Sequence, residues 1–245
     1  MEQYVLGSPD DDEDGADGVR RVEGDDTALA FTVRDISALD APAKAMLADV
    51  CVGLTDECAA NAELAEQLHR LDFWRHAVPM VLAEPPLSAA ALRLLRVATG
   101  AVSSLDVAAR ACELGLPLWL LGLREPSEAS ARFNRSVAAT LAEQPARDDA
   151  LQLLGYVSGQ STFHATADLF EPAVVLRALF RLLRGSPSDD AACGGSRTLE
   201  WLVRYDKGRR HAALDAADVH DVLIPLYLRK TDTAKDALAA ALRRT

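Results

Sequence analysis

A unit of about 40 residues recurs along the chain, and this recurrence constrains the fold more than any other feature. Each copy has an amphipathic helix, a break at a small residue, a second helix and a final apolar helix. Because one such unit cannot bury its apolar faces alone, successive units must stack into a continuous core. The copies lie at residues 91–126, 150–187 and 198–232, with a more divergent copy at 45–86 and a lone terminal helix at 233–245.

The register of the copies is set by two leucines and a glycine. In the first copy, Leu92, Leu95 and Ala98 recur at three-residue steps, with arginines beside the stripe, which favours an amphipathic helix over a strand. Runs of β-branched residues with a period of two are essentially absent, so the sequence predicts an all-α chain. The aligned positions are Leu92, Leu95 and Gly100, then Leu151, Leu154 and Gly159, then Leu199 and Leu202, with Gly208 near the break.

Four segments carry a resemblance to a known family. "ARACELGLPLWLLGLREP" (109–126) and "ALDAADVHDVLIPLYLRKTD" (213–232) resemble the second and third helices of an armadillo repeat. In that family a small residue precedes an apolar-Pro-x-Leu start of the third helix, and Gly115-Leu116-Pro117-Leu118 is similar to it. "ALRLLRVATG" (91–100) and "TLEWLVRYDKG" (198–208) resemble the first helix of the repeat.

The resemblance covers roughly residues 42–245 and implies a right-handed α-solenoid of roughly four to five armadillo-like repeats, in a domain spanning 27–245. Two stretches depart from the period. Residues 127–149 are predicted to be an inserted or partial repeat with one amphipathic helix. Residues 185–196, "GSPSDDAACGGS", are predicted to form a flexible loop between units. Import receptors of the family bind a basic peptide through asparagines and tryptophans on inner helices. That activity is not expected, because the only asparagines, Asn61 and Asn134, lie elsewhere.

Charge is unevenly distributed along this acidic chain. The formal net charge is −11, yet residues 1–26 alone carry ten acidic and two basic side chains, whereas residues 171–245 carry ten acidic and thirteen basic ones. Residues 1–26 have almost no large apolar side chain, so they are predicted to form a disordered acidic tail. Asp40, followed by Pro42, is the predicted start of the first helix, because a capping carboxylate and an early proline both suit a helix N-terminus.

Neither a membrane nor a secreted location is expected. No apolar run reaches the length that spans a bilayer, and the first residues lack the basic and apolar regions of a secretion signal, so the predicted location is cytoplasmic or nuclear. The four cysteines form no CxxC pair and have no histidine at metal-ligand spacing, so they are predicted to be reduced and mostly buried: Cys51, Cys58, Cys112 and Cys193.

Two groups of side chains could suggest chemistry. A metal site would use two histidines one heptad apart and nearby acids, but surface or interhelical histidines are favoured: His69, His76, Glu66 and Asp72. A catalytic triad needs its members within hydrogen-bond reach beside an oxyanion site. Ser161, His164 and Asp168 lie in one short stretch without a strand-turn-helix context. The sequence therefore predicts a protein that is not an enzyme and binds neither a cofactor nor a metal.

The third helices would line the concave face of an armadillo-like array. Arginine and aromatic side chains supply most of the binding energy of interfaces. The candidate partner-binding residues on these helices are therefore Trp74, Arg75, Trp119, Arg177, Arg181, Arg184, Tyr227 and Arg229. Alternatively, the two tryptophans belong to the core and the arginines form a solvated face. Arg209 and Arg210 follow Trp201 and Tyr205 at an inter-helix turn, where they either meet the helix dipole or bind an acidic partner.

These observations predict a non-enzymatic interaction scaffold or adaptor that binds a peptide or helix of another protein on its concave face, alone or within a multi-subunit complex. Two alternatives stay open. One is an armadillo-type co-chaperone that embraces the ATPase domain of a heat-shock chaperone. The other is binding of nucleic acid or an acidic ligand through the basic C-terminal third, at Arg204, Lys207, Arg209 and Arg210, which the acidic net charge disfavours for nucleic acid.

Overall fold

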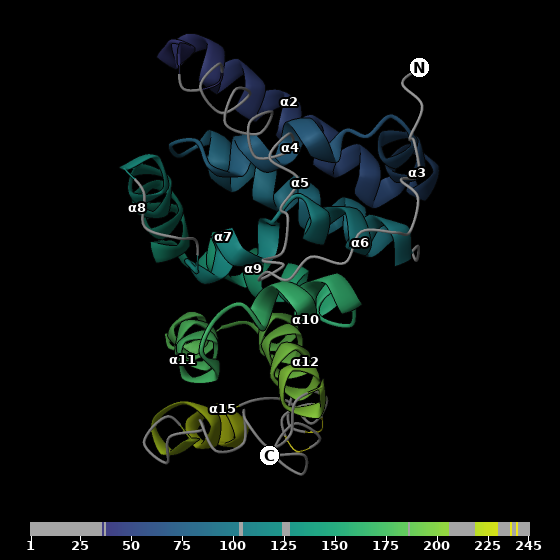
Figure 1. Cartoon of the computed structure of the whole chain (residues 1–245). Helices are drawn as coiled ribbons and strands as arrows, with labels where there is room; N and C mark the ends of the chain where they lie inside the picture. Colours follow the sequence, from purple (N-terminus) through teal and green to yellow (C-terminus); the bar gives the residue numbers. More distant parts are fainter. Residues whose placement is uncertain are drawn as a thin grey trace, which may run out of the picture.

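The computed structural model describes residues 36, 38–102, 105–123, 128–185, 187–205 and 219–229, with single positions at 236 and 239. Regular secondary structure in these residues is helical throughout, which confirms the predicted all-α class (Figure 1). The predicted acidic tail at 1–26 lies outside the described residues, as does most of the predicted terminal helix at 233–245. None of the described helices combines the length and apolar content that crossing a bilayer requires.

In chain order, the described helices are α2 (Ala41–Ala60), α3 (Ala62–Arg70), α4 (Trp74–Val81), α5 (Leu87–Ala101), α6 (Leu105–Glu113), α7 (Leu116–Leu121), α8 (Glu128–Ala142), α9 (Gln144–Val157), α10 (Ser161–Ala167), α11 (Pro172–Leu183), α12 (Asp189–Tyr205), the π-helical turn η1 (Val219–Leu223) and α15 (Ile224–Arg229). The long helices α2 and α5 are each followed by two short ones, and the long helices α8 and α9 are consecutive.

Local signals fix several helix ends. The backbone N–H of Ala43 donates to Asp40 Oδ1 at 2.9 Å, and Pro42 lies in the first turn of α2, as predicted. Asn61 ends α2 and also caps α3, because its side-chain oxygen accepts from the N–H of Glu63 at 3.0 Å. These short side-chain caps satisfy backbone donors that have no partner within the helix.

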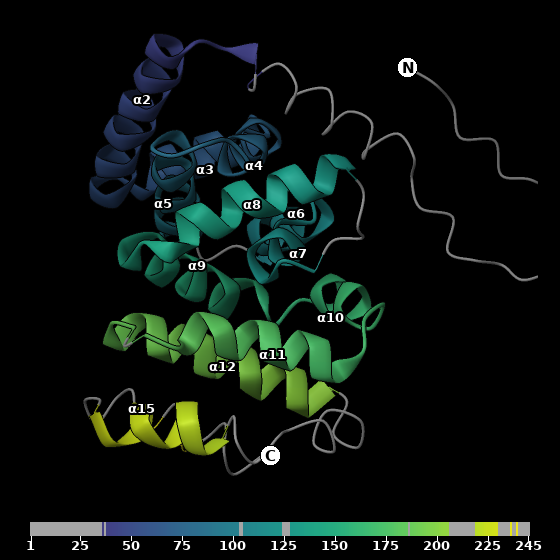
Figure 2. The ribbon, with the colours of Figure 1, turned by 90° about the vertical axis from the view of Figure 1, so that its left-hand side faces the viewer.

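Four long helices, α2, α5, α9 and α12, pack one on the next in chain order. Figures 1 and 2 show this stack descending from α2 at the top to α12 near the bottom. Shorter helices accompany it: α4 packs on α5, α7 packs on α9, and α11 packs on both α7 and α12. One hydrophobic core therefore runs the length of the stack.

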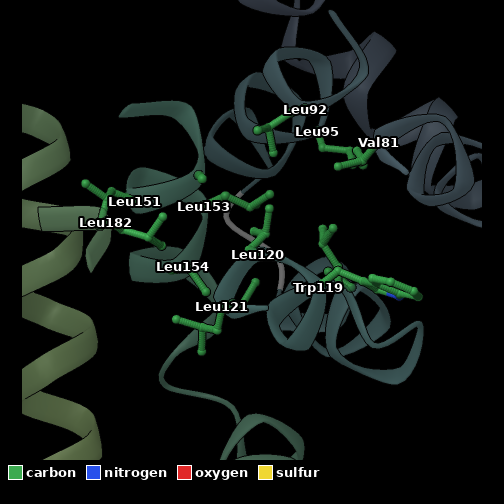
Figure 3. Packing of buried hydrophobic residues seen from close by; sticks show 14 of the residues in the cluster. Val81, Leu92, Leu95, Trp119, Leu120, Leu121, Leu151, Leu153, Leu154 and Leu182 are labelled. Carbon is green, nitrogen blue, oxygen red and sulfur yellow. The ribbon is translucent and has the colours of Figure 1, made fainter. Parts of the chain in front are cut away.

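The leucines that set the repeat register face this core. Each of the six is at most 1% exposed: Leu92 and Leu95 on α5, Leu151 and Leu154 on α9, and Leu199 and Leu202 on α12. Figure 3 shows Leu120 and Leu121 of α7 pointing toward Leu153 and Leu154 of α9. The six leucines therefore share one structural role, as the repeat pattern predicts. The aligned glycines do not, because Gly100 lies inside α5 rather than at a break, whereas Gly159 follows the end of α9.

Helices α9 and α12 approach so closely that their backbones touch. A Cβ atom built on Gly155 of α9 would lie 2.6 Å from the Cα of Gly194 in α12, and one on Gly194 would lie 2.8 Å from the Cα of Gln152. Real Cβ atoms do not approach backbone atoms this closely. Only glycine therefore fits at both positions, and this crossing sets how tightly the last long helix packs on the stack.

The prediction of a flexible loop at 185–196 is wrong for residues 189–196, whereas residues 185, 187 and 188 lie outside the helices. Residues 189–196 form the first two turns of α12, and Gly194 and Gly195 are buried within it. Helix propensity disfavours a Gly-Gly pair by about 2 kcal/mol in total relative to alanine. Close packing offsets this cost, because the same glycines admit the backbone of α9 and the Leu183 side chain of α11.

The residues beyond the repeat period form α8, which crosses α5, α7 and α9 (Figure 2). The Thr140 hydroxyl of α8 lies 2.6 Å from the Ser88 hydroxyl of α5, and both residues are buried. All six residues of α7 are buried, as expected for a short apolar helix covered on several sides. The helix after this insertion begins at Gln144, earlier than the predicted copy at 150.

Two ion pairs link neighbouring units. Arg110 of α6 donates from Nε and Nη2 to the two carboxylate oxygens of Asp72, both at 2.9 Å, in the turn between α3 and α4. Arg96 of α5 lies 2.7 Å from Asp149 of α9. The hydrogen bond from Arg110 lowers the pKa of Asp72, whereas burial raises the pKa of Asp149 despite the nearby Arg96.

The close crossing predicts opposite effects for the same substitution at two helical glycines. Gly194→Ala places a methyl group against the α9 backbone, so we expect a loss of about 1–3 kcal/mol in the free energy of unfolding. Gly53→Ala in α2 meets nothing within 4 Å and should instead stabilise by roughly 0.5–1 kcal/mol. Urea unfolding followed by circular dichroism measures both. If Gly194→Ala were as stable as wild type, the close backbone contact between α9 and α12 would be contradicted.

The Asp72–Arg110 pair predicts a stability difference that depends on pH. The folded chain lowers the pKa of Asp72, so the stabilisation is present above the unfolded pKa of about 4 and is lost as pH falls. Because the Asp72 side chain is 42% exposed, we expect Asp72→Asn to cost less than about 1 kcal/mol at neutral pH. The difference from wild type should shrink in acid. A difference that stays constant across acid urea titrations would argue against this role.

Candidate partner-binding site

The exposed face of α11 carries the candidate site. Glu171 precedes the helix and Pro172 occupies its first position, a combination that favours a helix start. The opposite face is apolar and buried in the core: Val175, Leu176, Leu179, Leu182 and Leu183. This burial orients the helix so that Arg177 and Arg181, its only charged residues, are exposed together with Val174 (Figure 2 shows the placement of α11).

Arg181 has a structural contact as well as an exposed surface. Its Nη2 donates to the carbonyl oxygen of Leu121 at 3.0 Å, at the end of α7. The last carbonyls of a helix have no partner within it and carry partial negative charge, so a guanidinium is a favourable partner there. Arg181 therefore links α11 to α7 through a neutral acceptor and keeps its full positive charge.

Arg177 is likewise not neutralised by a carboxylate. Its Nε donates to the carbonyl of Ala173, one turn earlier in α11, at 3.1 Å. Among the described residues, ion pairs engage Arg70, Arg96 and Arg110, but neither Arg177 nor Arg181. The face of α11 thus presents two guanidinium charges that no described carboxylate compensates.

Two further arginines extend this surface at the end of α11. Arg184 ends the helix in extended backbone and is exposed. Arg147 of α9 donates from Nη2 to the carbonyl of Gly185 at 3.2 Å, which brings a fourth guanidinium to the same end. We call Arg177, Arg181, Arg184 and Arg147 the arginine row.

The other predicted partner-binding residues do not join this row. Trp74 and Trp119 are each 1% exposed, so they are core residues and cannot contact a partner; their positions on apolar helices are buried on the packed side. Arg75 is exposed on α4. Tyr227 and Arg229 lie on α15, but their side chains are outside the description, and Arg209 and Arg210 lie outside the described residues.

Three of the four residues of the possible metal site, His69, Asp72 and Glu66, make other contacts, and His76 is exposed. The indole N–H of Trp74 donates to His69 Nδ1 at 2.9 Å. Asp72 is held by Arg110, and Glu66 lies 3.5 Å from Arg70 along α3. Within the described ranges, no three histidine, cysteine or acidic side chains come together in a way that could hold a metal ion.

His164 of the possible triad is instead part of an aromatic contact between α10 and α12, whereas Ser161 and Asp168 are exposed. His164 is 1% exposed, and its ring stacks on that of Tyr205 at 4.1 Å between centroids and 8° between planes. Ser161 is exposed at the start of α10. Trp201 packs beside Gly159, and Arg204 lies over the Trp201 ring at 5.1 Å. Trp201 and Tyr205 of α12 therefore pack on α10 and on the turn before it.

Comparisons of the chain with protein-family models, with curated proteins and with solved structures find no match. The assignment of function consequently depends on the geometry of the chain itself.

The burial of the cysteines predicts their reactivity. Burial raises the pKa of Cys112 to about 12, and it also raises the pKa of Cys51 and Cys58. Since the thiolate is the reactive form, these three should react slowly with an alkylating reagent in the folded chain. Cys193 is the least buried of the four and should react first. Mass spectrometry after brief alkylation measures the order, and modification of Cys112 as early as Cys193 would contradict it.

Proposed function

We propose that the chain is a non-enzymatic interaction scaffold, built as a right-handed armadillo-like solenoid, that binds an acidic segment of a partner protein along the arginine row. The arginine row is the observation that carries the binding part of the proposal. The repeated order of helices supports the architectural part.

The order of helices supports four stacked units. A long helix, a shorter one and an apolar third recur as α2–α3–α4, α5–α6–α7 and α9–α10–α11, and α12 with α15 supplies the corresponding parts of a fourth. The long helices begin at Ala41, Leu87, Gln144 and Asp189, and the longest interval contains the additional helix α8. Units that bury their faces only against neighbours are typical of solenoids.

The chemistry of the arginine row favours a carboxylate-rich ligand. A guanidinium presents donors in a planar fork that matches a carboxylate, and charge-assisted bonds of this kind are stronger than neutral ones. Arg177 and Arg184 are exposed and seven residues apart, so they lie two turns apart along α11 and its C-terminal cap. Val174, 36% exposed, adds an apolar contact at the start of the same face. An acidic segment with an apolar residue near one end fits this surface.

The proposed binding surface does not continue as a groove along all the third helices. Since every residue of α7 is buried, that helix offers no side chain to a ligand. The binding surface proposed here therefore begins at α11, beyond α8, and uses arginine rather than tryptophan.

A binding assay with the full chain tests the proposal. The probe is a fluorescein-labelled peptide that alternates glutamate with alanine and leucine, and a matched lysine peptide controls for charge. We expect Arg177→Glu with Arg184→Glu to weaken binding of the glutamate peptide by about tenfold or more, because like charges then face each other. Arg181 is left intact because it also contacts α7.

Arg135→Glu with Arg70→Glu is the matched control, since it makes the same total charge change at exposed positions on α8 and α3. Binding should persist in this control and fall with added salt. Equal loss in the control, or no loss in the double variant, would refute the proposal. If a single-stranded oligonucleotide binds more tightly than the peptide and requires the same arginines, the ligand of the arginine row is nucleic acid rather than a protein segment.

A further inference from the structure

Helix α2 forms one end of the described stack and packs on α5 through only one of its faces. The residues on that face are buried: Ala48, Cys51, Thr55 and Cys58. The opposite face carries large apolar side chains that are exposed by 63% at Met46 and 51% at Val50, and Val52, 50% exposed, lies on the flank of the helix. The equivalent helices α5 and α9 are covered from both sides by their neighbours in the stack.

An apolar outer face is unusual at the end of a stack. Terminal repeats of solenoids normally carry a polar outer face, because nothing follows them. On α2, Met46, Val50 and Gly53 follow one another at four- and three-residue spacing, so they form one stripe along the exposed side. We call these three residues the α2 stripe. Its composition is that of a helix packed between two long helices, although α5 is the only long helix that packs on α2 among the described residues.

Gly53 supports this interpretation independently. Glycine in the middle of a helix costs about 1 kcal/mol relative to alanine, and Gly155 and Gly194 occur where another backbone approaches closely. An added Cβ on Gly53 would meet nothing within 4 Å, so nothing among the described residues explains a glycine there. A second helix crossing at Gly53 would explain it in the same way.

The charges beside the stripe indicate what kind of helix fits. Asp49 and Asp56 are exposed on one side of the stripe, and Glu57 is exposed one turn beyond Gly53 at its end. No described cation pairs with these three carboxylates. The only cation of α2, Lys44, lies toward the packed side, 3.7 Å from Glu84. The outer face of α2 is therefore apolar along its centre and acidic beside it.

We infer that the α2 stripe docks an amphipathic helix of another protein, with small and apolar residues against Gly53 and lysine or arginine opposite Asp49 and Asp56. A second copy of this chain fits less well, because two α2 faces would bring like charges together. This site is separate from the arginine row, it takes the opposite charge, and it stands whether or not that row binds a ligand.

Fluorescence anisotropy with the full chain tests this inference. The probe is a labelled helical peptide of alanine, leucine and lysine with one apolar stripe, and the matched probe has glutamate in place of lysine. We expect the lysine peptide to bind, and Gly53→Gln to weaken that binding by about tenfold or more, because the added side chain blocks the crossing. Ala59→Gln is the control, since it adds the same side chain to an exposed position on another side of α2.

Charge reversal separates docking on α2 from nonspecific attraction to the acidic chain. Asp49→Lys with Asp56→Lys should shift the preference toward the glutamate peptide. The inference is overturned if the lysine peptide does not bind, or if its binding survives both Gly53→Gln and the charge reversal.

Two further measurements exclude other occupants of the stripe. Without any peptide, the Gly53→Gln variant should unfold at a temperature no lower than that of wild type. A lower unfolding temperature would mean that another part of the chain itself covers the α2 stripe. Sedimentation should give a monomer-sized species. Self-association that Gly53→Gln abolishes would assign the stripe to a second copy and overturn the inference.

Discussion

The backbone contact between α9 and α12 is the constraint on which the C-terminal half of the fold depends. At Gly155 and Gly194 the two helices meet without side chains between them. This approach places Trp201 beside Gly159 and lets Tyr205 stack on His164 of α10. It also lets Leu183 of α11 reach Gly195, so the helix that carries the arginine row is positioned by the same crossing. The proposed binding surface is thus a consequence of how closely two helices pack.

Much of this architecture follows from the sequence because helical periodicity is a local property. The paired leucines of the three copies are buried as their register implies, and Asp40 caps the N-terminus of α2. The glycines of 185–196 were harder to interpret, because glycine serves either a flexible loop or a close helix crossing. Only the tertiary partner distinguishes these uses, and that partner, Gly155, lies far away in sequence.

The candidate site residues also differ in whether the sequence alone could place them. Arg177 and Arg181 could be placed on one helix face from their spacing, because a charged residue on an otherwise apolar helix faces solvent. Trp119 could not be placed, because the short helix α7 is apolar on every side and gives no phase. Trp74 begins α4, an eight-residue helix too short to fix the phase of its first residue from the sequence. The exposed apolar face of α2 could not be identified from the sequence for a related reason. Its stripe resembles an ordinary buried face until the stack shows which side α5 occupies.

The two proposed surfaces give the chain an acidic, apolar end at α2 and a basic face at α11, which suits a scaffold that holds partners of different charge. Amide hydrogen exchange of the full chain, with and without the glutamate-rich peptide, tests the basic surface most directly. The account predicts slower exchange at the exposed turns of α11 and the following residues to Gly185, with α2 unchanged. Protection elsewhere, or no protection at α11 at saturating peptide, would contradict it.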